Sequence, residues 1–269
     1  MLDDLVTIAL KAGAAIMAIY ARFDPATMAT KGDGSPVTEA DAAAEALILE
    51  ELARLAPEIP VVAEEAVAAG QVPETGRRFF LVDPLDGTKE FISRNGEFTV
   101  NIALIEDGVP VLGVVYAPAI GVIYAGGKGQ GAKVADVEAG KIGAWRAISV
   151  RAEPQHGGLC VIASRSHLTD ETKSFIERFS VADFVTAGSS LKFCKLAAGE
   201  ADLYPRLGRT MEWDTAAGDA VLRAAKGAVL TMDGKPLVYG KRNQKDDVDF
   251  ANPWFAATGR FDPFASAEQ

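Results

Sequence analysis

The sequence has few of the residues that form disulfides or transition-metal sites. Its 269 residues include only two cysteines, Cys160 and Cys194, and only two histidines, His156 and His167. This supply excludes the paired Cys and His ligands of a zinc site and the disulfide framework of a small secreted domain. Cys160 lies in an apolar stretch and Cys194 in a predicted helix, so we expect two buried free thiols in a reducing, cytoplasmic compartment.

Positive charge is also scarce. The chain has 27 Lys and Arg residues against 37 Asp and Glu residues, which gives a formal net charge of −10. A general binder of nucleic-acid polymers needs clustered Lys and Arg, so that class is excluded. An anionic small molecule would be repelled at long range, and metal ions or local cations would have to offset that repulsion.

The sequence also lacks a convincing membrane segment. The apolar stretch 5–21 follows Asp3 and Asp4 and contains Lys11, which is unlike a secretory signal. The stretch 108–127 carries no charge and is long enough to span a bilayer. Its prolines, glycines and β-branched residues instead predict two strands joined near Pro118. We therefore expect no transmembrane segment.

What is present is the composition of an ordinary globular enzyme, with 49% hydrophobic residues. We predict an α+β fold in two lobes, residues 1–150 and 151–269. The first lobe is rich in hairpins, and Asp107-Gly108 between two apolar runs is the strongest turn signal. Helices are expected over 2–20, 38–55, 169–179, 189–198 and 214–226, and strands over 59–63, 79–82, 98–105, 109–116, 121–124, 159–163, 183–186, 203–204 and 228–232.

Four acidic features stand out along the chain, and each has an ordinary structural explanation. Asp41 could complete a capping box begun by Thr38. Glu64 and Glu65 could form a solvated loop. The other two features are Asp83 with Asp86, where Asp86-Gly87 could be a turn, and Asp214, which could cap the helix that follows it.

The segment around Asp83 resists the ordinary explanation. A buried strand over 79–82 ends in two carboxylates, Asp83 and Asp86, with Pro84 fixing the backbone between them. Two carboxylates ~4 Å apart repel by about 4 kcal/mol at an effective dielectric constant of 20. Such a pair at a strand end indicates a bound cation, and hard oxygen ligands suit Mg²⁺. Gly87 and Thr88 would then offer backbone N–H groups to a phosphate.

These residues resemble the signatures of a known family. Residues 81–91 (LVDPLDGTKEF) closely resemble the first signature of the inositol monophosphatase superfamily, and 213–218 (WDTAAG) resemble the second. Two upstream elements, 35–41 (SPVTEAD) and 63–65 (AEE), match in order and approximate spacing. The resemblance spans nearly the whole chain and implies a five-layered αβαβα sandwich.

The resemblance also implies roles for individual residues, with two to three Mg²⁺ ions in the site. One ion would be held by Glu64, Asp83 and the backbone carbonyl of Leu85, and a second by Asp83, Asp86 and Asp214, with a weaker third on Glu64. Thr88, oriented by Asp41, would help to deprotonate the attacking water. In this assignment the catalytic residues are Asp41, Glu64 and Thr88, and Glu65 has no ligand role.

Within the superfamily the chain looks most like the bacterial 3'(2'),5'-bisphosphate nucleotidases of sulfate assimilation. Residues 164–167 (SRSH), 188–194 (GSSLKFC) and 203–206 (LYPR) carry this likeness. It implies that His167 lies against the adenine of adenosine 3',5'-bisphosphate, while Ser189, Lys192 and Arg206 hold the nucleotide and the phosphate that is not cleaved. Ser189 also stands where a helix N-cap is expected, and Arg209 is a further candidate cation.

Alternatives remain at this stage. Another enzyme of the superfamily, acting on inositol monophosphate or a sugar phosphate, would share the same metal ligands. A non-catalytic metal- or phosphate-binding protein would not need the pair Asp41 and Thr88. Oligomeric state and the loose association of bacterial relatives with the inner membrane face cannot be read from the sequence, and residues 135–147 and the tail after Asn252 carry no functional signal.

Overall fold

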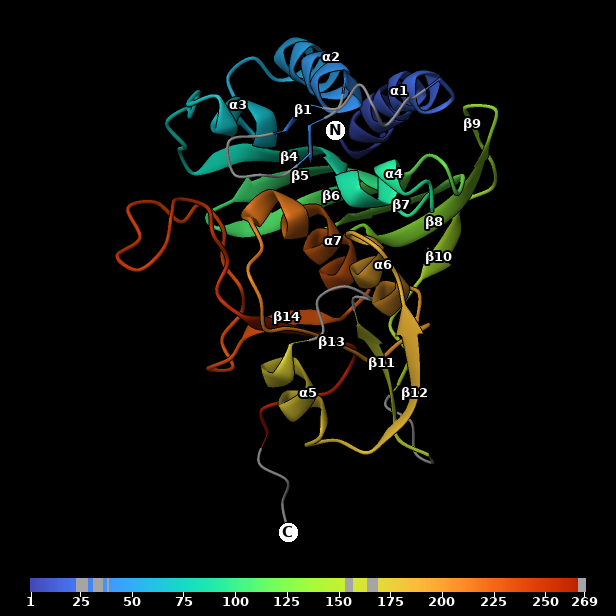
Figure 1. Ribbon diagram of the computed structural model, residues 1–269, viewed down its shortest axis with the longest axis vertical. Coiled ribbons are helices and arrows are strands. Elements are labelled where there is room, and N and C mark those ends of the chain that lie inside the picture. Colours follow the sequence, from blue (N-terminus) through green and yellow to red (C-terminus); the bar gives the residue numbers. More distant parts are fainter. Residues whose placement is uncertain (23–28, 31–35, 38, 153–156, 164–168, 266–269) are drawn as a thin grey trace.

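The computed structural model describes residues 1–22, 29–30, 36–37, 39–152, 157–163 and 169–265. Two β-sheets, one in each half of the chain, form its framework (Figure 1). A short two-stranded pairing of β1 (Ala29–Thr30) with β2 (Pro36–Val37) lies apart from them. The helices are α1 (Leu2–Tyr20), α2 (Glu39–Leu55), α3 (Glu64–Ala68), α4 (Thr88–Ile92), α5 (Asp170–Ile176), α6 (Leu191–Ala197) and α7 (Glu212–Ala224).

The first sheet has the strand order β10-β8-β7-β6-β5-β4-β3, with β9 paired to β8. Only β3 and β4 run parallel to each other, and the remaining pairs are antiparallel. Its strands are β3 (Val61–Ala63), β4 (Arg78–Asp86), β5 (Thr99–Glu106), β6 (Val109–Ala117), β7 (Val122–Gly127), β8 (Gly131–Glu138), β9 (Lys141–Ile142) and β10 (Arg146–Ile148).

The second sheet has the order β12-β11-β13-β15-β14 and is mixed. The strands β12, β11 and β13 run parallel, whereas β15 is antiparallel to both β13 and β14. Its strands are β11 (Leu159–Ala163), β12 (Val181–Thr186), β13 (Leu203–Arg206), β14 (Ala228–Thr231) and β15 (Phe255–Thr258).

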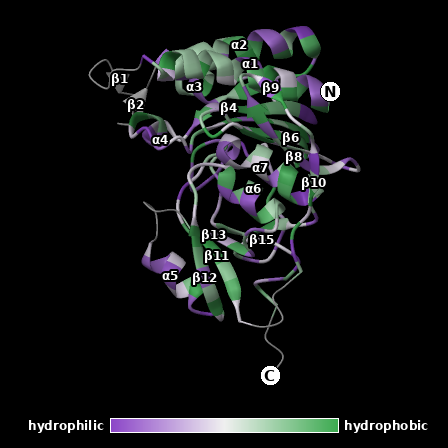
Figure 2. Ribbon diagram, turned by 90° about the vertical axis from the view of Figure 1, so that its right-hand side faces the viewer, coloured by the Kyte–Doolittle hydropathy of each residue, from purple (hydrophilic) through white to green (hydrophobic). Residues whose placement is uncertain are grey.

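Helices alternate with the two sheets, which gives the αβαβα order expected from the sequence. Figure 1 shows α1 and α2 on one face of the first sheet, α6 and α7 between the sheets, and α5 beyond the second sheet. The side chains of β4 follow this arrangement, because Phe80 and Val82 join the core beneath α1 and α2, while Phe79 and Leu81 join the core shared with α6 and α7. A strand covered on both faces is apolar at successive positions. The apolar strands and the polar turns of α1, α2 and α5 are visible in Figure 2.

Several elements lie where the sequence predicts them. The first helix spans residues 2–20 and a strand spans residues 159–163, both as expected. The hairpin at Asp107-Gly108 is also confirmed, since Glu106 pairs with Val109 and both turn residues have positive φ, 49° and 75°. Residues 108–127 contribute β6 and β7, and no described helix is long and apolar enough to cross a membrane. Both cysteines are free and buried, as expected.

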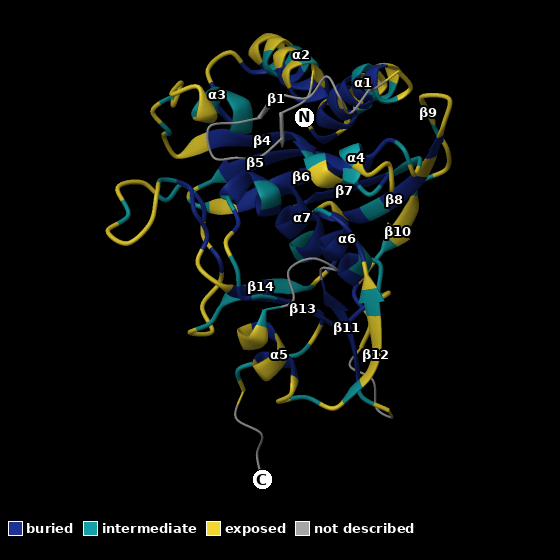
Figure 3. Cartoon of the chain, viewed as in Figure 1, coloured by how far each residue is buried: buried dark blue, intermediate teal, exposed yellow. Residues whose placement is uncertain are grey.

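Other strands were not predicted from the sequence. Residues 131–148 add β8, β9 and β10 to the first sheet, and β15 in the tail lies inside the second sheet. The sequence of β15 is FAAT, and alanine has a low intrinsic preference for strands. It pairs with β13 on one side and with β14 on the other, and its four residues are buried, whereas the edge strand β12 is largely exposed (Figure 3). We conclude that β15 forms because it pairs with strands that are distant in the sequence, and not because of its own strand preference.

The two halves of the chain share one central helical layer. The strands of the first sheet come from residues 61–148 and those of the second from 159–258. However, α7 belongs to the second half and packs against β4, β5, β6 and β7 of the first sheet. The division into lobes 1–150 and 151–269 follows the change of sheet, and its meaning as two domains stays a prediction.

Close approach of α7 to the first sheet depends on glycines in the strands. A Cβ atom placed on Gly113 of β6 would collide with the carbonyl oxygen of Ala217 and lie 2.7 Å from the Cβ atom of Ala220. On β7, a Cβ atom at Gly126 would lie 2.7 Å from the Cα atom of Val221. These glycines set the distance between α7 and the sheet, and therefore the position of every side chain on that helix.

We expect Gly113→Ala to destabilise the protein by about 1–3 kcal/mol, because the added methyl group overpacks a rigid helix–sheet contact. Urea unfolding followed by circular dichroism measures the change. Gly76→Ala is the matched control, since a Cβ atom there meets no atom within 4 Å. A Gly113→Ala variant as stable as Gly76→Ala would show that α7 can shift without loss.

Candidate active site

The parallel pair β3 and β4 brings the first acidic residues together. Ala63 pairs with Val82, so Glu64 and Asp83 follow the paired residues at the same end of neighbouring strands. Glu64 is the first residue of α3, and Asp83 is 1% exposed. The carboxyl ends of parallel strands meet at one sheet edge, and this edge forms the floor of the candidate site.

A β-bulge places Asp83 and Asp86 on the same side of β4. Residues three apart in a regular strand point to opposite faces. The register shifts between them, so that Asp83 pairs with Asn101 and Asp86 pairs with Thr99 on β5. Asn101 and Thr99 are two residues apart and share a face, and each β4 carboxylate faces the same way as its partner. The bulge therefore converts a spacing of three into two carboxylates on one face.

The residues of the bulge have distinct local roles. Pro84 has no N–H group to donate to the ladder, which suits a bulged position, and Asp83 Oδ1 accepts the N–H of Leu85 at 3.0 Å. The side chain of Leu85 is buried in the core beneath α1 and α2, so only its backbone is available as a ligand. Gly87 follows with φ 94°, a conformation that favours glycine, and Thr88 then begins α4.

Asp214 reaches the site from α7. The helix begins at Glu212 rather than at residue 214, with Met211 in the N-cap position. Our alternative reading of Asp214 as an N-cap was therefore wrong. Its Oδ2 accepts the N–H of Met211 at 2.8 Å from the third helical position, because the side chain at that position can turn back toward the N-cap backbone.

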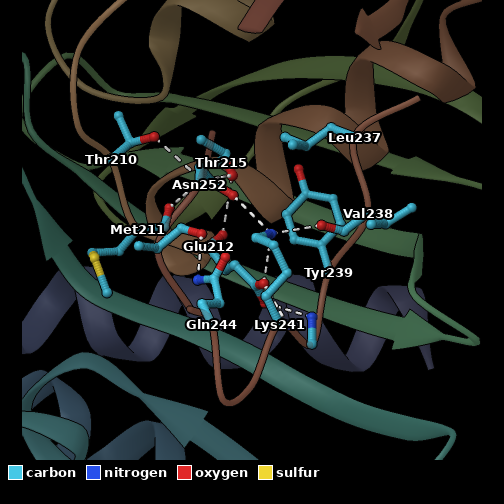
Figure 4. A network of polar contacts seen from close by, with 12 residues as sticks. Thr210, Met211, Glu212, Thr215, Leu237, Val238, Tyr239, Lys241, Gln244 and Asn252 are labelled. Atoms are coloured by element: carbon cyan, nitrogen blue, oxygen red, sulfur yellow. Dashed lines mark hydrogen bonds and ion pairs between the residues drawn. The ribbon is translucent and has the colours of Figure 1, made fainter. Parts of the chain in front are cut away.

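A buried polar network anchors the beginning of α7 to the segment 238–252 (Figure 4). Asn252 Nδ2 donates to the carbonyl oxygen of Met211 at 2.8 Å and to Thr215 Oγ1 at 3.0 Å. The carboxylate of Glu212, which has no exposed surface, accepts from the Nζ of Lys241 at 2.6 Å. A buried carboxylate with these partners is satisfied, so the network fixes the turn that carries Asp214.

Asp41 and Glu45 approach from α2. They are four residues apart on one helix face, and both are buried. Glu45 Oε2 accepts the backbone N–H of Glu65 at 2.8 Å. Burial raises the pKa of Glu45, and the charges of Glu65 and Glu64 raise it further. Glu45 thus supports the start of α3. Thr38, which would begin the expected capping box with Asp41, lies outside the described residues.

The carboxylates repel one another where their access to solvent is limited. Burial raises the pKa of Asp83 well above its usual range, and the charges of Glu64, Asp86, Asp214 and Asp41 add to the shift. Burial likewise raises the pKa of Asp214, with Asp86 and Glu64 adding to it. The pKa of Asp86 rises to about 6 through burial, although the charge of Lys192 opposes the shift. Acidic residues from four separate segments therefore share one electrostatic environment.

A loop from the second half of the chain closes over Asp86. Ser189 has φ 49° and is not the N-cap of α6, which corrects our expectation; Ser190 occupies that position. Ser189 Oγ donates to the carbonyl oxygen of Asp86 at 2.9 Å, and the N–H of Ser190 donates to Asp86 Oδ2 at 2.7 Å. Ser190 Oγ also donates to the carbonyl oxygen of Asp214 at 2.6 Å. The loop thereby ties Asp86 to Asp214.

The basic side chains that were predicted to bind the substrate differ in burial and in their hydrogen-bond partners. Lys192 is almost fully buried, and its Nζ donates to the carbonyl oxygen of Ser189 at 2.7 Å. Burial lowers the pKa of Lys192 to about 8, with Asp86 opposing the shift. Arg206 donates to the carbonyl oxygen of Arg209, and its buried Nε has no partner among the described residues. Arg209 pairs with Asp247 at 3.4 Å, and His167 lies outside the described residues.

The donor set fits a hard divalent cation. Carboxylate oxygens and the backbone around Leu85 are oxygen ligands, and their mutual repulsion is what a cation would relieve. In the described part of the chain, no three acidic, histidine or cysteine side chains stand together as a preformed ligand group. Mg²⁺ commonly binds one or two carboxylates and keeps several waters, so smaller sets suffice. The exact ligands stay a prediction.

Sequence reasoning missed the neutral residues that connect the acidic ones. Asn101 and Ser190 are buried and join Asp86 to Asp214, and Asn252 supports the turn before Asp214. One signal was available, because Asn101 is a polar residue between apolar neighbours in a mostly apolar strand. A buried polar residue at such a position needs a hydrogen-bonding reason.

We expect the metal-free protein to lose stability as pH rises. Folding raises the pKa of Asp86 from 3.8 to about 6, so the folded state binds more protons than the unfolded state in that window. The contribution of Asp86 to stability is therefore greatest below about pH 4 and is lost as the pH rises through about 6. Asp83 and Asp214, whose pKa values are also raised, extend the loss to higher pH. Thermal unfolding in EDTA at a series of pH values measures this, and Mg²⁺ should restore stability at pH 7–8.

Asp83→Asn tests the same repulsion directly. In EDTA near pH 8 we expect it to exceed the wild type in stability, because the amide removes a buried charge that Glu64, Asp86 and Asp214 repel. Glu138→Gln removes a charge from an exposed position and serves as the control. A less stable Asp83→Asn protein in EDTA would contradict the repulsion.

Comparisons with known proteins agree over nearly the whole chain. The 3'(2'),5'-bisphosphate nucleotidase CysQ of Shigella flexneri is 47% identical over 256 residues, which cover 95% of this chain and 98% of the relative. The enzyme of the same name from Salmonella typhimurium is 48% identical over 259 residues, covering 96% of this chain and 99% of the relative.

Solved structures have the same architecture. CysQ from Bacteroides thetaiotaomicron superposes with a TM-score of 0.78 at 37% identity and covers 97% of both chains. An inositol monophosphatase from Anabaena superposes with a TM-score of 0.71 at 26% identity, covering 96% of this chain and 89% of the other. Since a profile of the inositol monophosphatase family matches residues 1–260 as well, the chain belongs to the inositol monophosphatase family.

Proposed function

We propose that the protein is a Mg²⁺-dependent phosphomonoesterase that releases the 3'-phosphate of adenosine 3',5'-bisphosphate to give AMP. The observation that carries this proposal is the electrostatic interaction of the buried Asp83 with Glu64, Asp86 and Asp214, together with the charge of Lys192 acting on Asp86. The choice of substrate is supported by relatives that are named bisphosphate nucleotidases and align over almost their full length.

The acidic residues would hold the cations. Glu64, Asp83 and the Leu85 carbonyl would form one site, and Asp83, Asp86 and Asp214 a second, with Glu64 also able to serve a third. Bound Mg²⁺ supplies charge stabilisation and lowers the pKa of water, so that hydrolysis needs no covalent intermediate. The raised pKa values of Asp83 and Asp86 mean that cation binding and proton release are coupled at these carboxylates.

Thr88, oriented by Asp41, would accept the proton of the attacking water. Thr88 begins α4 directly after the Gly87 turn, and Asp41 lies close enough to Asp83 for its charge to raise the pKa of that carboxyl. A hydroxyl oriented by a carboxylate can accept a proton from water and pass it on. Gly87 and Thr88 also present backbone N–H groups suited to phosphate oxygens.

The second half of the chain would hold the rest of the nucleotide. Arg206 has a buried Nε atom left for a ligand, and a guanidinium is suited to phosphate oxygens. Lys192 supports the loop at Ser189 and places positive charge beside Asp86. A substrate with two phosphates gains from these fixed cations more than a monophosphate does. His167 would contact the adenine.

The first test compares substrates with the full-length protein. In Mg²⁺, we expect phosphate release from adenosine 3',5'-bisphosphate to exceed that from inositol 1-phosphate by at least ~10²-fold in kcat/KM, because the missing cation contacts correspond to about 3 kcal/mol. Activity in EDTA should be lost. Equal turnover of the two substrates would replace this proposal by an inositol monophosphatase.

Asp83→Asn supplies the control for a catalytic role. We expect a loss of ~10³-fold or more in kcat, since a cation at this position stabilises transition-state charge by several kcal/mol. Circular dichroism should show that the variant is folded. Turnover that persists in this variant, or in EDTA, would contradict a cation-dependent reaction at Asp83, whereas a wild-type protein that binds Mg²⁺ but releases no phosphate would favour a non-catalytic cation- or phosphate-binding protein.

Lithium gives a further check on the second cation position. We expect millimolar Li⁺ to inhibit phosphate release at subsaturating Mg²⁺, because a small monovalent cation can enter the site at Asp86 and Asp214 without supplying the charge of Mg²⁺. Initial rates measured across a series of Li⁺ concentrations, with Na⁺ at matched ionic strength as control, test this. Identical rates in Li⁺ and Na⁺ would count against the expectation.

A further inference from the structure

Strand β5 carries two polar side chains in the middle of the first sheet. Thr99 and Asn101 are 0% and 1% exposed. Val100 and Ile102, which alternate with them, belong to the core beneath α1 and α2. A polar group in such a position destabilises the fold unless it has a partner, so both residues require an explanation beyond packing.

Both side chains face the carboxylates of β4. Asn101 pairs with Asp83, and Thr99 pairs with Asp86 across the bulge. Directly opposed residues of an antiparallel pair point the same way, with Cβ atoms about 4.5–5.5 Å apart. The four side chains therefore lie on the face of the sheet that is turned toward α6 and α7.

In the amide group of Asn101, the nitrogen has hydrogen-bond partners and the oxygen has none among the described residues. Its Nδ2 donates to Ser190 Oγ at 3.0 Å and to Asp86 Oδ2 at 3.4 Å. These two acceptors determine which end of the amide is nitrogen. In the described part of the chain, Asn101 Oδ1 and Thr99 Oγ1 are buried without a hydrogen-bond partner. Native proteins retain few such atoms, and those that persist commonly meet a water or a ligand.

We propose that Asn101 and Thr99 are positioning residues of the cation site. Asn101 Nδ2 holds the carboxylate of Asp86, and Asn101 Oδ1 and Thr99 Oγ1 accept hydrogen bonds from water that a bound cation retains. Mg²⁺ keeps several of its waters when it binds protein, and groups that hold those waters and ligands tune its affinity. This inference rests on the proposed function, because it takes Asp83 and Asp86 as cation ligands.

The chain contains a matched control for Thr99. Thr258 on β15 is also fully buried, and its Oγ1 likewise has no partner among the described residues, but it lies in the second sheet. Thr99→Val and Thr258→Val each replace one unpartnered buried hydroxyl by a methyl group. We expect both to leave the metal-free protein at least as stable as the wild type, because each removes an unsatisfied polar atom.

Cation affinity separates the two variants. We expect Thr99→Val to weaken Mg²⁺ binding about 10-fold, and Asn101→Leu, which also removes one of the hydrogen bonds to Asp86, by up to about 100-fold. Thr258→Val should bind Mg²⁺ like the wild type. Calorimetric titration of MgCl₂ into EDTA-stripped, full-length protein measures the affinities, and thermal unfolding of the same samples measures their stability.

The outcomes distinguish this inference from the proposed function. Weaker Mg²⁺ binding by Thr99→Val but not by Thr258→Val supports the inference, even if Asn101→Leu fails to fold. Wild-type affinity in Thr99→Val overturns it, while Mg²⁺-dependent release of phosphate by the wild type would leave the proposed function standing. A wild-type protein that neither binds Mg²⁺ nor releases phosphate overturns both.

Discussion

The organisation of this protein depends on like charges held together away from water. Asp83 is buried, Asp86 and Asp214 are partly buried, and the charges of Asp86, Asp214, Glu64 and Asp41 all act on Asp83. Repulsion of this kind would separate the side chains unless the surrounding structure resisted it. The pKa values of these carboxyl groups are raised because they are held in place despite burial and repulsion. A hard cation would relieve both, which makes it a suitable ligand of the site.

The resistance comes from elements of both halves of the chain. The bulge at Pro84 turns Asp83 and Asp86 to one face of β4, and glycines in β6 and β7 let α7 lie close to the sheet. The loop at Ser190 then bonds to Asp86 and to the carbonyl oxygen of Asp214. Because α6 and α7 lie between the sheets, a change in the packing of either sheet can reach the carboxylates.

Much of the candidate site was visible in the sequence, since carboxylates clustered at a strand end are unusual in any soluble protein. The segment around Asp83 and the motif around Asp214 predicted a cation site, and their resemblance to a family supplied its architecture. Of the neutral residues, only Asn101 gave a signal in the sequence, as a polar residue in a mostly apolar strand. Asn101, Ser190 and Asn252 acquire meaning only through partners far away in the chain, and alanine-rich β15 forms only because two strands enclose it.

Local chemistry was therefore determined by the sequence alone: the helix over 2–20, the Asp107-Gly108 turn, the apolar strand leading to Asp83 and the oxygen-rich choice of ligands. These follow from periodicity, turn preferences and the types of side chain present, which act over a few residues. Tertiary structure decided which carboxylates interact, that Asp214 occupies the third position of α7, and that Ser190 rather than Ser189 occupies the N-cap position of α6. Such choices depend on register and on contacts between distant segments, and no local pattern encodes them.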